Sequence, residues 1–88
     1  MNLDELRTQL DAVDSQLLPL FLQRMDIVRN VALYKKEEGL PIYQPQREAG
    51  ILAKVRKAAG PENADAAQAF FAALMAISKD EQQKLLDS

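Results

Sequence analysis

The chain lacks the residue types on which most enzyme chemistry depends. Its 88 residues include no cysteine and no histidine. The sequence therefore contains no disulfide, no thiolate nucleophile and no zinc–thiolate site, and it also lacks the commonest general base and metal ligand. Any chemistry must use arginine, lysine, carboxylates and amides. We accordingly expect no metal and no cofactor.

The chain has neither a large net charge nor a long apolar segment. Eleven Lys and Arg against thirteen Asp and Glu give a net charge of −2, which argues against a nucleic-acid partner. Apolar runs such as Leu17–Leu22, and even the nine residues Ala69–Ile77, are far shorter than the roughly 20 residues that span a bilayer. Acidic Asp4 and Glu5 stand where a signal peptide is basic. We expect a cytoplasmic protein with no membrane partner and one domain over residues 1–88.

Hydrophobic periodicity predicts three helices and no strand, an all-α fold. A very long first helix is predicted from about Leu3 to about Lys36, with Asn2 as its N-cap. Pro19 lies inside it and predicts a bend rather than an end, because the apolar spacing continues in phase. The apolar residues of this helix recur at the 3-4 spacing of a packed helix and define a seam: Leu3, Leu6, Leu10, Val13, Leu17, Leu20, Ile27, Val31 and Tyr34.

Two further helices follow a turn at Gly39-Leu40-Pro41. A short second helix is predicted from near Pro45 to Gly60-Pro61. A medium third helix is predicted from Asn63, as N-cap, to about Leu86. Their predicted inward residues are Ile51, Leu52, Val55 and Ala59 on the second helix, and Ala67, Phe70, Phe71, Leu74, Ile77 and Leu85 on the third.

The length of the first helix predicts an assembly. About 34 helical residues extend ~50 Å, whereas a compact chain of this size is ~31 Å across. The seam remains apolar along nearly the whole helix, so its projecting part needs cover. The simplest cover is a second copy of the chain, and we expect a homodimer.

Polar residues on the apolar faces predict a binding site. Arg24 lies on the seam, and Lys35 follows it by about three turns on the same face. Each polar residue could have a purely structural role: an ion pair or an extended stem for Arg24, a solvated helix end for the others. An excess of cations converging in an acidic protein is better explained by an anionic ligand, and two guanidinium groups suit two carboxylates. The converging residues are Arg24, Lys35, Arg47, Glu48, Ser78 and Gln82.

This pattern resembles the all-helical chorismate mutases, the AroQ class, from Leu3 to Leu86. The matching pieces are Leu6-Arg7 followed by Asp14, Gln23-Arg24-Met25, Val31 to Lys35, Arg47-Glu48, and Ser78 with Gln82. The resemblance implies an intertwined homodimer whose long first helix spans both active sites. It also implies the Claisen rearrangement of chorismate to prephenate, which needs no cofactor, in the pathway to phenylalanine and tyrosine.

The resemblance also implies a role for each site residue. Arg24 and an Arg7 from the partner chain would hold the two substrate carboxylates, with Arg47 and Ser78 completing that side. Lys35 and Gln82 would donate to the ether oxygen. Glu48 would accept the ring hydroxyl. Gln44 stands where many relatives carry an acidic residue that contacts the same hydroxyl, and Gln is a poorer N-cap than Asp.

Two other functions fit parts of this pattern. One is an isochorismate pyruvate lyase on the same scaffold, a branch that does not keep the Arg-Glu pair present at Arg47-Glu48. The other is a non-catalytic helical dimer that binds an acid of the aromatic pathway or docks on a partner enzyme. The full set of cationic positions argues against this second alternative.

Overall fold

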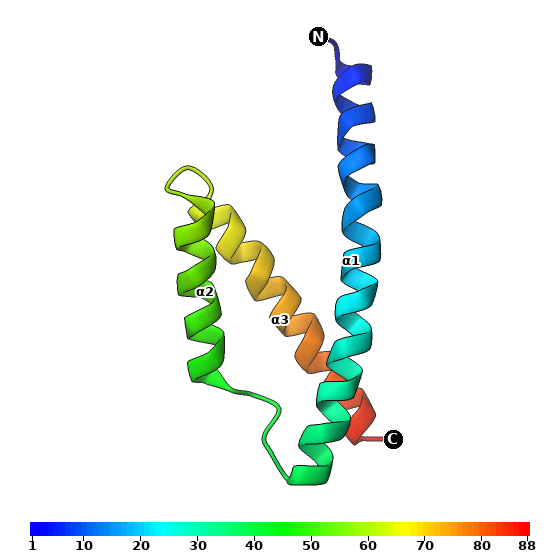
Figure 1. The fold of residues 1–88 in the computed structure, drawn as a ribbon, viewed down its shortest axis with the longest axis vertical. Helices are drawn as coiled ribbons and strands as arrows, with labels where there is room; N and C mark the ends of the chain where they lie inside the picture. The colour runs from blue at the N-terminus through cyan, green and yellow to red at the C-terminus, as the bar shows by residue number, and fades with distance from the viewer.

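The computed structural model describes residues 1–88 and contains three helices and no strand (Figure 1). Helix α1 spans Leu3–Glu38, α2 spans Pro45–Ala59 and α3 spans Ala64–Leu86. The predicted all-α class and the order long, short, medium are confirmed. Helix α3 packs against both α1 and α2, which do not pack against each other. The body of the molecule therefore consists of the C-terminal half of α1 together with the whole of α2 and α3.

Helix α1 begins with the predicted cap and runs through its proline. The side chain of Asn2 accepts a hydrogen bond from the Glu5 N–H at 2.9 Å, and the Glu5 carboxylate accepts one from the Asn2 N–H at 3.3 Å. This reciprocal pair is a capping box. The helix continues without interruption past Pro19, as predicted, but the predicted bend is not seen, because α1 runs without a sharp bend in Figure 1.

A left-handed glycine ends α1 and redirects the chain. Gly39 has φ 68° and ψ 29°, a conformation that costs a residue with a Cβ about 1–2 kcal/mol. The carbonyl of Lys35 accepts hydrogen bonds from the N–H groups of both Gly39 and Leu40. This cap sends the following segment back toward the Lys35 side chain.

The other two helix starts lack side-chain caps. Gln44 occupies the N-cap position of α2, but its Nε2 donates to the Pro41 carbonyl at 2.9 Å instead of capping the helix. Asn63 occupies the N-cap position of α3, as predicted, but its side chain makes no capping hydrogen bond. Pro45 at the first position of α2 matches the prediction.

The core of one chain is very small. Seven of its 88 residues are buried, and the apolar ones are Met25, Val28, Ala32, Ala64 and Met75. Every seam residue of α1 is exposed in a single chain. Helix α3 covers a different face of α1, the one that carries Met25, Val28 and Ala32. Cover of the seam by a second copy of the chain stays a prediction.

Helix α3 is rotated relative to the predicted stripe. Its buried positions Met75, Ser78 and Gln82 follow the 3-4 spacing toward α1. Phe70 and Ile77 lie roughly 110–130° around the helix from that line and are 50% and 41% exposed, so their predicted burial is wrong for a single chain. The remaining predicted residues of α3 and all four of α2 are half-buried: Ala67, Phe71, Leu74, Leu85, Ile51, Leu52, Val55 and Ala59.

The molecule is elongated, as the length of α1 predicted. It measures 54 × 28 × 15 Å and has a radius of gyration of 16.1 Å, against about 12 Å for a compact chain of this size. The N-terminal part of α1 projects beyond α2 and α3 in Figure 1. None of the three helices is long and apolar enough to cross a membrane.

The left-handed cap yields a stability test. Replacing Gly39 by Ala should lower the free energy of unfolding by about 1 kcal/mol, because a Cβ is strained at this φ although no neighbouring atom lies within 4 Å. Thermal unfolding at fixed protein concentration should show a Tm lower by roughly 4–8 °C. The matched control is Gly50→Ala, since Gly50 lies inside α2, equally without neighbours, and this change should raise stability. Equal effects of the two changes would contradict the cap.

Candidate functional site

A cavity of about 280 Å³ lies between the three helices and the loop that joins α1 to α2. Seven of the predicted site residues line it: Arg24 and Lys35 from α1, Gln44 from the loop, Arg47 and Glu48 from α2, and Ser78 and Gln82 from α3. The structure therefore brings together residues that are up to 58 positions apart in the chain. Apolar residues such as Val31, Ile51 and Met75 form the rest of the wall.

The cavity concentrates positive charge in an acidic chain. Arg24, Lys35, Arg47 and Lys79 line it with a single carboxylate, that of Glu48, whereas the chain as a whole carries −2. Of the four cations, only Lys79 has an ion-pair partner. The three other cations are available to an anionic ligand with two or more negative oxygens.

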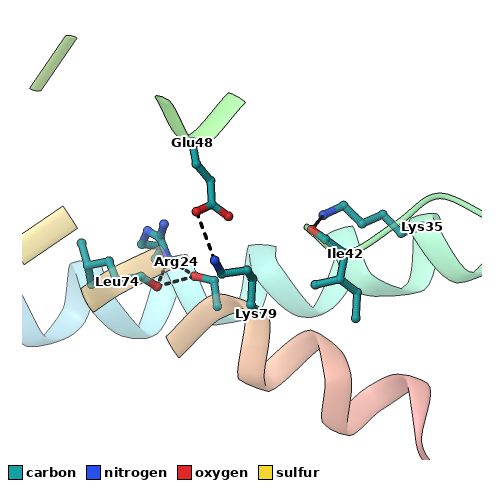
Figure 2. A network of polar contacts seen from close by, with 7 residues as sticks. Arg24, Lys35, Ile42, Glu48, Leu74 and Lys79 are labelled. Carbon is teal, nitrogen blue, oxygen red and sulfur yellow. Dashed lines mark hydrogen bonds and ion pairs between the residues drawn. The ribbon is translucent and has the colours of Figure 1, made fainter. Parts of the chain in front are cut away.

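Arg24 is positioned by α3. Its guanidinium donates to the Ser78 hydroxyl and, at 3.4 Å, to the carbonyl of Leu74. Ser78 in turn donates to the same carbonyl at 2.8 Å, and Figure 2 shows Arg24 beside Leu74. No carboxylate pairs with Arg24, so a structural ion pair does not account for this arginine on an apolar seam.

Lys35 and Gln82 form a second positioned pair. The Lys35 ammonium donates to the Gln82 side-chain oxygen at 3.0 Å and to the Ile42 carbonyl at 2.9 Å, the latter seen in Figure 2. Gln82 is only 6% exposed, so it does not belong to a frayed last turn. An ammonium has three donors and an amide nitrogen two. The pair therefore keeps one Lys35 donor and the Gln82 NH₂ group for a ligand.

The surroundings of Lys35 lower its pKa from 10.5. Burial is the largest cause, since it disfavours the charged form. The nearby Arg47 cation lowers the pKa further, and the Glu48 carboxylate acts in the opposite direction. The site thus holds its central ammonium at an electrostatic cost that a bound anion would relieve.

Lys79 is the site residue that the sequence analysis missed. Its Nζ pairs with Glu48 Oε1 at 3.1 Å (Figure 2) and lies 4.7 Å from the centre of the Tyr43 ring. The sequence signal for it is a spacing of four residues from Met75, which places both on one face of α3. Because Met75 did not belong to the predicted stripe, this spacing did not point to Lys79.

Arg7 lies outside this cavity. It is exposed on the projecting part of α1 and makes no hydrogen bond or ion pair. A second, mostly apolar groove of about 430 Å³ lies between α1 and α3, lined by Asp14, Leu17, Leu18, Leu20, Phe21, Arg24, Phe70, Phe71 and Leu74. Arg24 borders both hollows, so the groove and the cavity adjoin at this residue.

The geometry of fold and site defines a class of protein. It is an all-α protein whose three helices build a cationic cavity with fixed amide, hydroxyl and ammonium donors. Nowhere do three or more carboxylates gather in a way that could hold a metal ion. Such a site can bind a small dianion, restrict its conformation and stabilise negative charge that develops on it.

The comparison with known families agrees with this class. The model of the family "Chorismate mutase type II" matches residues 6–83, nearly the whole chain. The chain therefore belongs to the chorismate mutase type II family, and the resemblance seen in the sequence is confirmed.

Several relatives are similar over part of the chain. The T-protein of Enterobacter agglomerans is 49% identical over 57 residues, which are 65% of this chain and 15% of that protein. The chorismate mutase of Methanocaldococcus jannaschii is 35% identical over 63 residues, 72% of this chain and 64% of that protein. A 4-amino-4-deoxychorismate mutase of Streptomyces pristinaespiralis is 37% identical over 65 residues, 74% of this chain and 50% of that protein. No solved structure matches the chain.

The causes of the Lys35 shift can be tested separately. In a titration followed by NMR of the Lys35 Nζ, the midpoint should lie below 10.5. Arg47→Ala should raise this pKa because it removes a repelling cation, and Glu48→Gln should lower it because it removes an attracting anion. Shifts of the same sign in the two variants would contradict the electrostatic account.

The lowered pKa of Lys35 makes the free energy of unfolding depend on pH. Because the folded pKa lies below the unfolded value, the contribution of Lys35 to stability is largest above the unfolded pKa and is lost as pH falls through the folded pKa. A dianion bound beside Lys35 should oppose this effect and raise the measured pKa.

Proposed function

We propose that the chain catalyses the rearrangement of chorismate to prephenate, as a chorismate mutase. The observation that carries this proposal is the cavity itself, with three unpaired cations and the Lys35–Gln82 donor pair on one side of it. Family membership supports the same activity. The matched region covers 15% of the T-protein and 64% of the chorismate mutase of Methanocaldococcus jannaschii. The activity is therefore a proposal for this chain, and it is argued from the chain's own cavity.

The polar groups of chorismate match the cavity. The molecule carries two carboxylates, an ether oxygen and a ring hydroxyl. The carboxylates suit Arg24 and Arg47, with the Ser78 hydroxyl beside Arg24. The hydroxyl is the one substrate group that can donate a hydrogen bond, and Glu48 is the only carboxylate that lines the cavity. We therefore assign the hydroxyl to Glu48.

Gln44 is a second acceptor for the same hydroxyl. Its nitrogen donates to Pro41, which leaves its side-chain oxygen able to accept. An amino group in place of the hydroxyl would also suit a carboxylate such as Glu48. One relative is a 4-amino-4-deoxychorismate mutase. The amino analogue of chorismate is therefore the compound with which chorismate should be compared to test the assignment of the hydroxyl to Glu48.

The reaction requires that the substrate be held in its reactive conformation and that negative charge be stabilised at one atom, the ether oxygen. As the carbon–oxygen bond of the ether breaks and the new carbon–carbon bond forms, no proton is transferred. Negative charge develops on the ether oxygen in the transition state. The remaining Lys35 donor and the Gln82 NH₂ group are the positioned donors for it. Donors of this kind act most strongly when they are fixed before the reaction.

We infer that the working enzyme is an intertwined homodimer. A single chain buries only seven of its 88 residues and leaves the α1 seam exposed. The apolar groove between α1 and α3 has the character of a site for the projecting half of a partner's α1. Because Arg24 borders this groove and the cavity, a helix in the groove can bring its Arg7 to the substrate.

The decisive experiment is to follow the absorbance of chorismate with the purified chain. Loss of chorismate with formation of prephenate is the expected result. Release of pyruvate from isochorismate, with chorismate unchanged, would instead support a lyase. Binding of either acid without turnover would support the non-catalytic dimer.

Lys35→Ala should reduce kcat by about 10²–10³-fold, as removal of one oxyanion donor does, with a much smaller change in KM. The charge that Lys35 stabilises develops mainly in the transition state, so the loss belongs to turnover rather than to binding. Lys36→Ala is the matched control, because Lys36 is the exposed next residue outside the cavity. A raised KM with unchanged kcat in Lys35→Ala would remove Lys35 from the ether-oxygen role.

The shared site can be tested by mixing inactive variants. Arg7 and Arg24 lie 17 residues apart on α1, hence about 25 Å along the helix, too far for one substrate. Refolding Arg7→Ala together with Arg24→Ala should restore about a quarter of wild-type activity, because half of the dimers are mixed and one of their two sites is intact.

The control for this test is a mixture of Arg24→Ala with Lys35→Ala. Both residues line the cavity of their own chain, so no mixed dimer contains an intact site and activity should stay low. Restoration in this control, or none in the first mixture once mixed dimers are demonstrated, would contradict an Arg7 supplied by the partner.

A further inference from the structure

The Glu48–Lys79 ion pair is the part of the cavity that the proposed reaction leaves unexplained. It joins α2 to α3, with Nζ and Oε1 3.1 Å apart, and Figure 2 shows the two side chains approaching each other from their helices. Both are partly shielded, with 33% of the Lys79 and 22% of the Glu48 side chain exposed. The Tyr43 ring, 4.7 Å from Nζ, holds Lys79 from another side. Lys79 is therefore a fixed charge beside the only carboxylate of the site.

Lys79 changes what Glu48 can recognise. A lone carboxylate accepts a hydrogen bond from a hydroxyl, but it attracts an ammonium more strongly because the charges are opposite. With Lys79 at 3.1 Å, the negative charge of Glu48 is already compensated. A second cation placed against Glu48 would also lie close to the Lys79 ammonium and be repelled by it.

The hydrogen-bonding capacities of the two ligand groups lead to the same distinction. A hydroxyl both donates and accepts, so it can donate to Glu48 while it accepts from Lys79. A protonated amine has donors only, so it can satisfy Glu48 but leaves Lys79 without a partner. The ion pair is thus complementary to a hydroxyl and not to an ammonium.

We propose that Lys79 is a specificity-determining residue, which selects a hydroxyl over an amino group at the substrate position that meets Glu48. The inference rests on the proposed function and on the assignment of the ring hydroxyl to Glu48. It adds a repulsive element to the site, since specificity requires a cost for the wrong substrate as well as a gain for the right one.

The test compares kcat/KM for chorismate and for its analogue with an amino group in place of the ring hydroxyl. The wild-type chain should prefer chorismate. Lys79→Met keeps the length and apolar character of the side chain but removes the charge, and it should raise the relative kcat/KM of the amino analogue by about tenfold or more. Lys79→Arg should retain the preference. Lys84→Met is the matched control, because Lys84 is exposed on the same helix outside the cavity.

A pH series on the wild-type chain supplies a readout that a purely structural role would not move. The preference for chorismate should shrink as the pH rises and the amine loses its proton, which for a primary amine begins at about pH 8 or above. This series needs no variant, so it decides the matter even if Lys79→Met does not fold. A preference that stays constant while the amine deprotonates would overturn the proposal.

The outcomes also separate this inference from the function on which it rests. If the wild-type chain rearranges chorismate but Lys79→Met leaves the ratio of the two substrates unchanged, Lys79 is not a specificity residue and the proposed function stands. An equal rise of KM for both substrates overturns the specificity role in the same way, because it indicates a contact with a shared carboxylate. If the wild-type chain rearranges neither compound, both proposals fail.

Discussion

The packing of α3 along the C-terminal half of α1 is the contact on which the site depends. It buries Met25, Val28 and Ala32 against α3 and places Ser78 beside Arg24 and Gln82 beside Lys35. The same stripe of α3 thus supplies both the core and the polar partners of the two α1 cations. Because these partners are a hydroxyl and an amide rather than carboxylates, the cations are positioned without being neutralised. A small core and a charged cavity are built from one interface.

Helix α2 completes the cavity without touching α1. It is attached through α3, by the Arg56–Asp65 and Glu48–Lys79 ion pairs, and through the loop whose Ile42 carbonyl accepts from Lys35. The left-handed Gly39 matters for this loop, since the cap carbonyl belongs to Lys35 itself. Backbone geometry at the end of α1 and the orientation of the Lys35 side chain are therefore coupled. The cost of holding Lys35 there is visible in its lowered pKa.

The sequence was sufficient to predict the positions of the helices and seven of the eight polar residues that line the cavity. Periodicity, caps and Gly–Pro breaks are local signals, so the helix bounds followed from them. Arg24 and Gln82 could be recognised because a polar residue on an apolar stripe needs a polar partner or a ligand. Lys79 was missed because Met75, one turn before it, did not belong to the predicted stripe, and the rotation of α3 that brings Lys79 to Glu48 is not encoded locally. Burial of Phe70 was predicted wrongly because one chain has no element to cover it, whereas cover of the seam by a second chain stays a prediction.

The class of the fold, the excess length of α1 and the kinds of group available for chemistry follow from composition and local spacing, so they can be read from the chain alone. Which face of each helix is covered, and which side chains pair, cannot be read in this way. Those choices depend on the packing angle and rotation of helices far apart in the chain. Hence the Glu48–Lys79 ion pair, the donors that remain on Lys35 and Gln82, and the groove beside Arg24 depend on how the three helices pack together.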